Sequence, residues 1–190
     1  MNNTVFQTLY TLLADHGIET HFVQGLDPRQ SEIRRCEMIP VAVKVRNRAA
    51  GSLLSRVGIA AGTVLQPPVV ELFLKNDALD NPLVNRSHVA ALGLATEEEL
   101  AFVLATARHV NEVLTEYMRE ISIELVDFKL EFGRSGDGRL LLADDISPDN
   151  ARFWDARTHE PLDIDRFRRD LGGAEQAYQE LLHRMMGMEA

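Results

Sequence analysis

Alternation of apolar and polar positions is clearest in the run LVDFKLEFG at positions 125–133. Its even-numbered positions are apolar, while three successive odd-numbered positions carry Asp127, Lys129 and Glu131. A period of two predicts a β-strand with one apolar face and one ionisable face. On this pattern alone, the ionisable face is either a solvated surface or one wall of a charged site.

A hairpin is expected directly after this strand. Positions 134–138 are rich in turn-forming residues, and the largely apolar run at 139–143 predicts a returning strand. The hairpin would bring Asp144 into the neighbourhood of Asp127 and Glu131. Carboxylates gathered with a lysine suit a hard cation such as Mg²⁺, which takes a few carboxylates plus substrate phosphates as ligands. The acidic sequence DDISPD after the hairpin favours such a site over a solvated strand.

Helical spacing of apolar residues marks two longer stretches. The first, at 2–17, begins with a capping asparagine and ends at a glycine. The second, at 96–120, opens with the capping box TEEE, and its apolar stripe predicts core packing rather than a cofactor site. Two shorter helices are expected near the C-terminus, at 162–169 and 174–186.

Other apolar runs predict strands at 20–23, 39–46 and 69–74, with a chain break at Pro67-Pro68 before the last one. A loop of small residues, with the sequence RNRAAGS, begins at Arg46 and ends at Ser52.

Small residues in such a loop let a backbone approach a ligand, amides at a helix start bind anions, and an arginine adds a bidentate partner for phosphate. We therefore expect a phosphate site at this loop, with Ser52 capping the short helix that follows. The alternative is an ordinary strand–loop–helix unit with a serine cap.

Composition narrows the class of protein. A chain of 190 residues with 45% hydrophobic content can bury a core, as one domain or as two small lobes. Its net charge of −9 argues against general binding to nucleic acid polymers. The single cysteine, Cys36, excludes an internal disulfide, and without a signal peptide we expect a cytoplasmic location. No apolar run reaches membrane-spanning length, and the six histidines lack zinc-ligand spacing.

Two segments resemble the signatures of the SAICAR synthetase family. Positions 39–46 together with 50–52 resemble one signature, and positions 125–133 match the other without a mismatch. Shorter matches follow in the family's order and extend the resemblance over essentially the whole chain: Lys75-Asn76-Asp77, Ser147-Pro148-Asp149, Arg152-x-Trp154-Asp155 and Asp165-Arg166-Phe167-Arg168. On these motifs the chain is identified as a member of this family.

The resemblance implies a two-lobed α+β fold related to ATP-grasp and kinase-like nucleotide binders. Residues 1–74 would form the remainder of an N-terminal lobe with the phosphate loop, and residues 75–190 a C-terminal lobe with the Mg²⁺–ATP carboxylates. The implied reaction joins L-aspartate to the carboxylate of carboxyaminoimidazole ribonucleotide through an acyl phosphate, with ATP cleaved to ADP. Its product is SAICAR, an intermediate of de novo purine biosynthesis. A homodimer is an open alternative to a monomer.

The resemblance also implies roles for individual residues. The catalytic residues would be Lys129, Glu131 and Asp144. Of these, Glu131 and Asp144 would hold Mg²⁺ and, together with Met38 and Lys75, bind ATP. Those that bind the ribonucleotide substrate would be Arg46, Ser52, Asp127, Lys129 and Arg152.

Four positions depart from the family's pattern. Ala42 stands where the signature has Glu, Lys44 stands in a normally apolar stretch, Asn81 replaces Asp, and Asp145 replaces Glu. Ala42 and Lys44 share one strand face with Arg46, so together they exchange acid for base beside the phosphate site.

The sequence begins at the family's first long helix, without the glycine- and lysine-containing hairpin that covers the ATP phosphates. We therefore expect an incomplete N-terminal lobe, and little ligase activity from these 190 residues alone. Two alternatives stay open beside an ordinary family ligase. One is a relative that binds a ribonucleotide without turnover, and the other is a ligase that uses another amine or carboxylate.

Overall fold

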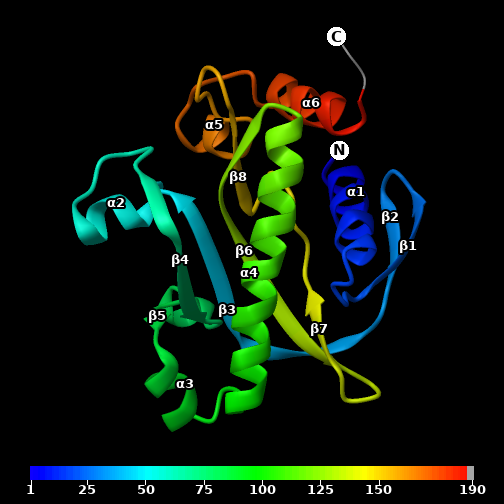
Figure 1. Ribbon diagram of the computed structural model, residues 1–190, viewed down its shortest axis with the longest axis vertical. Coiled ribbons are helices and arrows are strands. Elements are labelled where there is room, and N and C mark those ends of the chain that lie inside the picture. The colour runs from blue at the N-terminus through cyan, green and yellow to red at the C-terminus, as the bar shows by residue number, and fades with distance from the viewer. Residues whose placement is uncertain (188–190) are drawn as a thin grey trace.

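The structure of the chain, a computed structural model, describes residues 1–187. Its centre is a six-stranded antiparallel sheet in the order β5-β4-β3-β6-β7, with β8 also paired to β6 (Figure 1). The strands are β1 Phe22–Asp27, β2 Gln30–Ile33, β3 Cys36–Arg48, β4 Val64–Leu74, β5 Leu83–Val84, β6 Ile123–Ser135, β7 Leu140–Ala143 and β8 Ala151–Asp155. The helices are α1 Asn2–Asp15, α2 Ser52–Val57, α3 Arg86–Ala91, α4 Glu97–Glu120, α5 Asp165–Arg168 and α6 Ala174–Met185, with a 3₁₀ turn at Asp77–Leu79.

The predicted central strand and its hairpin are confirmed as β6 and β7. β6 has β3 along one edge, and along the other edge it pairs first with β8 and then with β7. The apolar side chains Phe128, Leu130 and Phe132 belong to the main core cluster. The opposite face carries the ionisable side chains, and Asp127 and Glu131 on that face are themselves buried. The ionisable face is therefore the wall of a site rather than a solvated surface.

The apolar face of β6 does not extend as far as Val126. The pairing of β6 with β8 shifts register between Leu125 and Asp127. As a result, Leu125 belongs to the main core, whereas Val126 packs in a small separate cluster with Ala50 and Trp154. The simple alternation expected over the whole run is wrong at this end, because the shift reverses the direction in which the side chains point.

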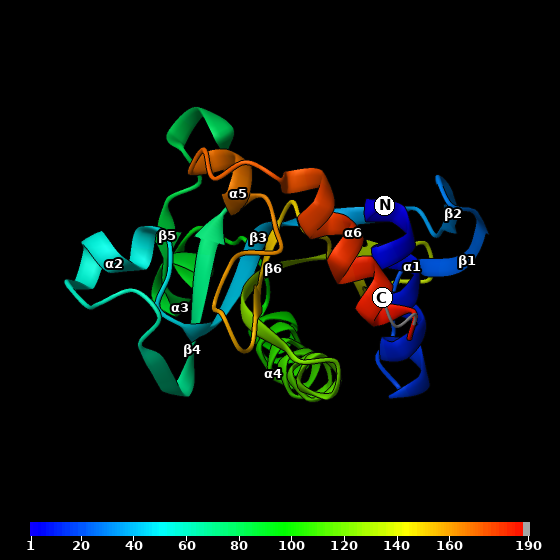
Figure 2. The ribbon, with the colours of Figure 1, turned by 90° about the horizontal axis from the view of Figure 1, so that it is seen from above.

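Helix α4 covers the apolar face of the sheet, packing against β6 and β3. Figure 2 shows α4 on one side of these strands and α5 on the other. The predicted capping box is present: Thr96 Oγ1 accepts from the Glu99 amide at 3.1 Å, and the Thr96 amide donates to Glu99 Oε2 at 2.8 Å. The expected core stripe of α4 is confirmed, since Leu100, Val103 and Leu114 are buried.

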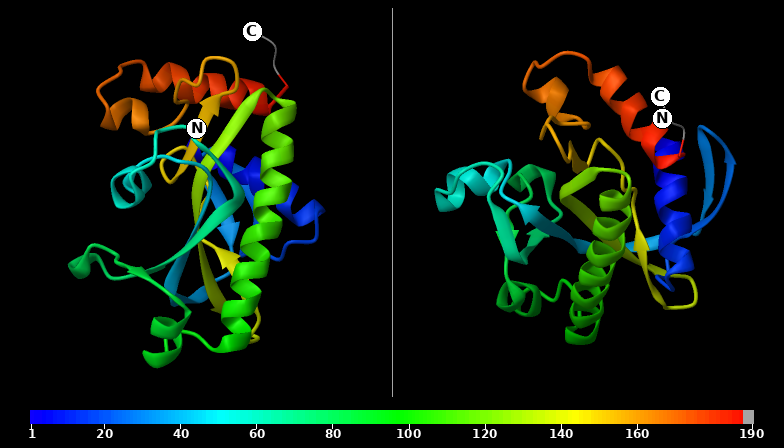
Figure 3. Two further views of the ribbon diagram at one scale, coloured as in Figure 1. Left: turned by 60° about the vertical axis from the view of Figure 1, so that its left-hand side comes forward. Right: turned by 45° about the horizontal axis from the view of Figure 1, so that its top comes forward.

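The two terminal helices pack together at one end of the molecule. α1 contacts α6, and the hydroxyl of Tyr117 near the end of α4 donates to the Met185 carbonyl of α6 at 2.9 Å (Figure 3). The expected asparagine cap of α1 is wrong, because the cap residue is Met1 and no side chain caps the helix. The expected break at the two prolines is also wrong, because β4 begins at Val64 and continues through them.

The fold is of the expected α+β class. Strands on both sides of the expected boundary at residues 74 and 75 share the central sheet. The division into lobes, and the relation to ATP-grasp and kinase-like binders, stay predictions. Within residues 1–187, no helix has both the length and the apolar composition needed to cross a bilayer.

Candidate active site

A cavity of about 710 Å³ opens on the ionisable face of the sheet. It is bounded by β3, β6, the start of β8, the segment after β4 and helix α5. Six cationic side chains line it beside four carboxylates. The cations are Lys44, Arg46, Lys75, Lys129, Arg152 and Arg168, the carboxylates are Asp77, Asp80, Glu131 and Asp149, and the other lining residues include Ala42, Ser52 and Asn81. The structure thus brings together most of the predicted substrate-binding residues, and we call this space the basic cavity.

Asp127 lies behind the wall of the basic cavity and is fully buried. Its carboxylate accepts from Arg46 Nη1 at 3.1 Å and from Arg152 Nη1 at 3.0 Å, and Lys44 Nζ lies 3.1 Å from Oδ1. Three cations thus share this carboxylate, and Arg46 and Arg152 each have a second carboxylate partner, in Glu71 and Asp165. Asp127 does not line the cavity, and its expected contact with substrate stays a prediction.

Arg46 is held in place by the protein itself. Its side chain is 1% exposed and donates to Glu71 Oε2 at 2.6 Å, to the Ala50 carbonyl at 3.2 Å and to Asp127. Its remaining contact is Ser52 Oγ, 3.4 Å from Nη2. The guanidinium of Arg46 is therefore already fixed by contacts within the protein before a ligand enters the cavity.

The small-residue loop packs directly on Arg152. A Cβ on Gly51, whose φ is +57°, would lie 2.8 Å from Arg152 Nη2, so a side chain at this position would displace the guanidinium. The expected role of Ser52 as the helix cap is wrong. Gly51 occupies the cap position, and Ser52 is the first residue of α2 with its hydroxyl near Arg46.

A second charged cluster surrounds Lys129. Its Nζ lies 2.5 Å from Glu131 Oε1 and 3.4 Å from Asp144 Oδ2, and Lys75 pairs with the other oxygen of Glu131. The structure therefore brings Glu131 and Asp144 together, as the hairpin predicted. Asp127 is instead part of the arginine cluster, so its expected grouping with Asp144 is not found.

Burial and neighbouring charges shift the pKa values of Lys129, Glu131 and Asp144. Burial alone would lower the pKa of Lys129, but its contacts with Glu131 and Asp144 outweigh burial and raise that pKa. Burial alone would raise the pKa of Glu131, yet the bonds from Lys129 and Lys75 lower it. Burial and then repulsion from Glu131 raise the pKa of Asp144. Lys129 therefore stays a cation, and Asp144 is the more easily protonated carboxyl.

A second cavity, of about 740 Å³, adjoins the first. Met38, Glu131 and Asp144 line it, and Glu131 lines both cavities. We call it the acidic-end cavity. A Cβ on Gly133 would lie 2.7 Å from Cys36 Cβ and 3.0 Å from Met38 Sδ, so the glycine allows β3 and Met38 to pack this closely.

Three arginines on the cavity walls were not singled out from the sequence. Arg34 and Arg35 line the acidic-end cavity, in the segment between β2 and β3 that carries no motif. Arg168 lines the basic cavity, and the only signal for it was its place in the motif DRFR.

The pair Glu131 and Asp144 suits a Mg²⁺ ion that takes its other ligands from water and phosphate. Mg²⁺ usually binds one or two carboxylates plus substrate phosphates rather than an all-protein cage. Within residues 1–187 no group of three or more His, Cys, Asp or Glu side chains is arranged as a metal site. Both oxygens of Glu131 are paired with lysines, so a Mg²⁺ ion bound to Glu131 would replace Lys75 or Lys129 on one of them.

The four unusual positions lie in these cavities. Ala42, Lys44 and Asn81 line the basic cavity, and Asp145 lines the acidic-end cavity. Burial lowers the pKa of Lys44, Asp127 opposes that effect, and Arg152 and Arg46 add to it. Lys44 is thus an additional amine in the cavity, and it has more tendency to lose its proton than a lysine in water.

Comparison with known proteins agrees with the site. The SAICAR synthetase family model matches residues 1–185. The chain belongs to the SAICAR synthetase family. A phosphoribosylaminoimidazole-succinocarboxamide synthase of Brevibacillus brevis is 53% identical over 187 residues, covering 98% of this chain and 78% of that protein. The same-named protein of Chlorobium luteolum is 50% identical over 190 residues, covering 100% of this chain and 79% of that protein.

Solved structures of the family share this fold. A "SAICAR synthetase (Type-2) in complex with ADP" has a TM-score of 0.95 at 41% identity, covering 100% of this chain and 81% of that one. A SAICAR synthetase from Pyrococcus horikoshii OT3 has a TM-score of 0.94 at 41% identity, covering 100% of this chain and 83% of that one. The expected family membership is thereby confirmed.

Proposed function

We propose that this protein is an ATP-dependent ligase that joins L-aspartate to the carboxylate of carboxyaminoimidazole ribonucleotide and forms SAICAR. The observation that carries the proposal is the meeting of two cavities at Glu131. One cavity has surplus positive charge for a phosphorylated, carboxylated substrate, and the other has two carboxylates suited to a metal–nucleotide complex. A ligase that transfers a phosphoryl group needs these two subsites in contact.

The basic cavity holds the ribonucleotide in this proposal. Arg152 and Arg168 present guanidinium groups and Ser52 presents a hydroxyl toward its 5′-phosphate. Arg168 is about half exposed, and its one ion pair within the described part of the chain is a 3.4 Å contact with Asp165. It is therefore freer than Arg46 to turn toward a ligand. Arg46 acts mainly by fixing Asp127 and the loop.

The acidic-end cavity holds ATP. Met38 provides an apolar contact for the base, and Arg34 and Arg35 lie where they can neutralise phosphate charge. Glu131 and Asp144 would hold Mg²⁺, which when bound neutralises charge on the transferring phosphoryl group. One structural relative was solved in complex with ADP, which supports nucleotide binding here.

The chemistry follows from the poor reactivity of a carboxylate toward amines, because its leaving group would be oxide. A carboxylate oxygen of the ribonucleotide forms a bond to the γ-phosphorus, and the bond from that phosphorus to ADP breaks. The aspartate ammonium loses one proton to solvent, its nitrogen forms a bond to the acyl carbon, and phosphate leaves. The nitrogen then loses a second proton to solvent and keeps one N–H in the amide. Lys129, whose pKa is raised by Glu131 and Asp144, would hold the substrate carboxylate.

A different amine substrate is the second candidate. Its support is the basic cavity itself, where Ala42 removes bulk and Lys44 adds a positive charge. An amine that carries more negative charge than aspartate would pair with the added positive charge of Lys44. Product analysis with aspartate and aspartyl-aspartate, which carries one more negative charge, as competing amines distinguishes the two, since the main proposal predicts SAICAR from the mixture.

The proposed function is tested by omission. The protein is incubated with ATP, Mg²⁺, aspartate and carboxyaminoimidazole ribonucleotide, and SAICAR and ADP are measured by mass spectrometry. We expect SAICAR only when all reactants are present, with one ADP formed for each SAICAR, whatever the rate. ADP formation that does not depend on the ribonucleotide, or binding of neither substrate, would contradict the proposal.

A further inference from the structure

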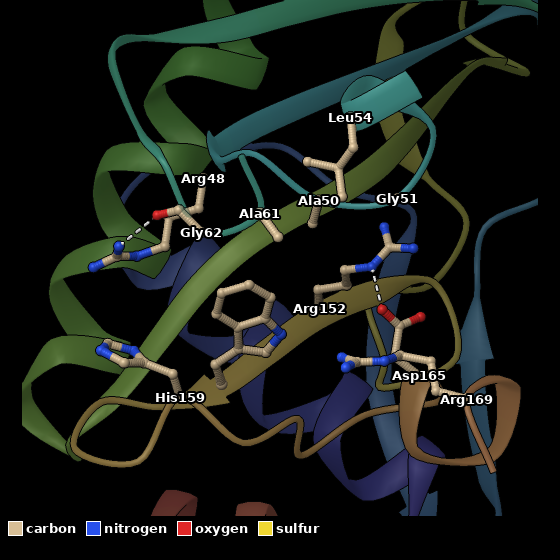
Figure 4. A pocket seen from close by; sticks show the side chains of 11 residues that line it. Arg48, Ala50, Gly51, Leu54, Ala61, Gly62, Arg152, His159, Asp165 and Arg169 are labelled. Carbon is tan, nitrogen blue, oxygen red and sulfur yellow. Dashed lines mark hydrogen bonds and ion pairs between the residues drawn. The ribbon is translucent and has the colours of Figure 1, made fainter. Parts of the chain in front are cut away.

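A third cavity, of about 810 Å³, lies behind the phosphate loop. Figure 4 shows Arg48, Gly62 and His159 along one side, Arg152, Asp165 and Arg169 along the other, and Ala50 and Leu54 beyond them. Its volume falls within the range of small-molecule sites. No step of the proposed ligase reaction uses it, and only Arg152 among its lining residues also lines the basic cavity.

The aromatic wall of this cavity is Trp154. The side chain is 9% exposed and packs with Ala50 and Val126. Within residues 1–187, its Nε1 is the only buried side-chain nitrogen or oxygen without a hydrogen-bond partner. Buried indole N–H groups usually find a partner, so an acceptor from a ligand would complete this one.

Glycine and alanine leave space beside the ring. A Cβ on Gly62, whose φ is +78°, would lie 3.7 Å from Trp154 Cζ3, so even a methyl group would touch the indole. Ala50 and Ala61 line the same space with single methyl groups. The ring is thus next to a volume that a flat molecule can occupy.

Charge on the cavity wall favours an anion. Arg48 is paired with Glu124 and Arg152 with Asp127 and Asp165. Arg169 is exposed and makes no ion pair or side-chain hydrogen bond within the part of the chain that the structure describes. Its guanidinium is therefore the group with full capacity to bind a carboxylate or phosphate.

We propose that this third cavity is a second binding site, which takes a small aromatic anion. A flat ring packs against Trp154 with an acceptor near Nε1–H, and a phosphate or carboxylate on the ring or its sugar pairs with Arg169. The site is separate from both subsites of the proposed reaction. Arg152 forms the wall between this cavity and the basic cavity.

The only tryptophan of the chain, Trp154, reports on this cavity through its fluorescence. The probe is adenosine 5′-monophosphate, titrated into the whole protein. Adenosine, which lacks the phosphate, and ribose 5-phosphate, which lacks the aromatic base, are the comparison ligands. We expect a saturable change with the nucleotide, and at least tenfold weaker binding of adenosine, which lacks the charge-assisted contact.

Two adjacent arginines provide matched variants. Arg169→Ala changes the third cavity and Arg168→Ala the basic cavity, and both side chains are exposed, so neither change disturbs the core. We expect Arg169→Ala to weaken the nucleotide about tenfold or more, and Arg168→Ala to leave its affinity within about twofold. Ala61→Leu, which fills the space beside the ring, should have the same effect as Arg169→Ala.

Three results would overturn the proposal: no saturable change, a nucleotide affinity that Arg169→Ala leaves unaltered, or equal losses in the two arginine variants. A loss in Arg168→Ala alone would assign the nucleotide to the basic cavity. None of these results bears on SAICAR formation, which is measured separately.

Discussion

Replacing Asp127 with asparagine removes one negative charge with almost no change in shape. The carboxylate is fully buried and holds Lys44, Arg46 and Arg152 at 3.0 to 3.1 Å. Without it, three cations would face one another inside the protein. We expect Asp127→Asn to destabilise the fold and to loosen the wall of the basic cavity.

The expected loss of stability depends on which ion-pair partners each of the three cations retains in the Asp127→Asn variant. Arg46 retains Glu71 and Arg152 retains Asp165, whereas Lys44 has no ion-pair partner other than Asp127 within residues 1–187. Removing one partner of a buried ion pair destabilises a protein by about 3–5 kcal/mol. Because two cations keep a partner, we expect about 3 kcal/mol, which lowers Tm by roughly 6–12 °C for a chain of this size.

The assay is urea unfolding followed by the fluorescence of Trp154, which lies on β8 two residues after Arg152. Asp80→Asn is the matched control, since Asp80 lines the same cavity, is exposed, and has a positive φ of 55° that asparagine tolerates. The control should stay within about 0.5 kcal/mol of the wild type. A stability of Asp127→Asn within about 1 kcal/mol of the control would refute the reasoning.

Two further predictions concern single residues. Arg46→Ala should weaken ribonucleotide binding by roughly 2–3 kcal/mol and also lower stability, because Asp127 and Glu71 lose a buried partner; unchanged affinity by calorimetry would move the phosphate subsite elsewhere. Burial raises the pKa of Asp163 to about 7, against the opposing hydrogen bonds from the Asp165 and Phe153 amides. A raised carboxyl pKa favours the fold at low pH, so stability should fall by roughly 4 kcal/mol as pH rises from about 3 to about 8. A carboxyl NMR titration of Asp163 with its midpoint near 4 would contradict this.

The sequence predicted the parts of the fold that local patterns determine. The period-two run defined β6, the turn-rich linker defined the hairpin, and the capping box at Thr96 fixed the start of α4. The charged face of β6 was predicted from Asp127, Lys129 and Glu131; Lys129 and Glu131 line the basic cavity, and Asp127 is buried behind its wall.

What the sequence did not reveal depends on contacts between distant segments. Alternation placed Asp127 with Glu131, but the register of β3 and β8 surrounds it with Arg46 and Arg152 instead. No pattern marks Arg34 or Arg35, because a loop arginine gains a role only from the cavity that the fold brings beside it. Ser52 looked like a cap, yet Gly51 with its positive φ occupies that position.

The most direct test of the central claim is calorimetric titration of carboxyaminoimidazole ribonucleotide into the wild-type protein and into the Arg168→Ala and Arg169→Ala variants. We expect the wild type to bind one ribonucleotide per chain in the basic cavity. The Arg168→Ala variant should bind it at least tenfold more weakly, a loss of about 1.4 kcal/mol in binding free energy. Arg169→Ala, which changes the neighbouring cavity, should leave the affinity within about twofold. No binding to the wild type, or an affinity that Arg168→Ala leaves unaltered, would contradict the assignment of the basic cavity to the ribonucleotide.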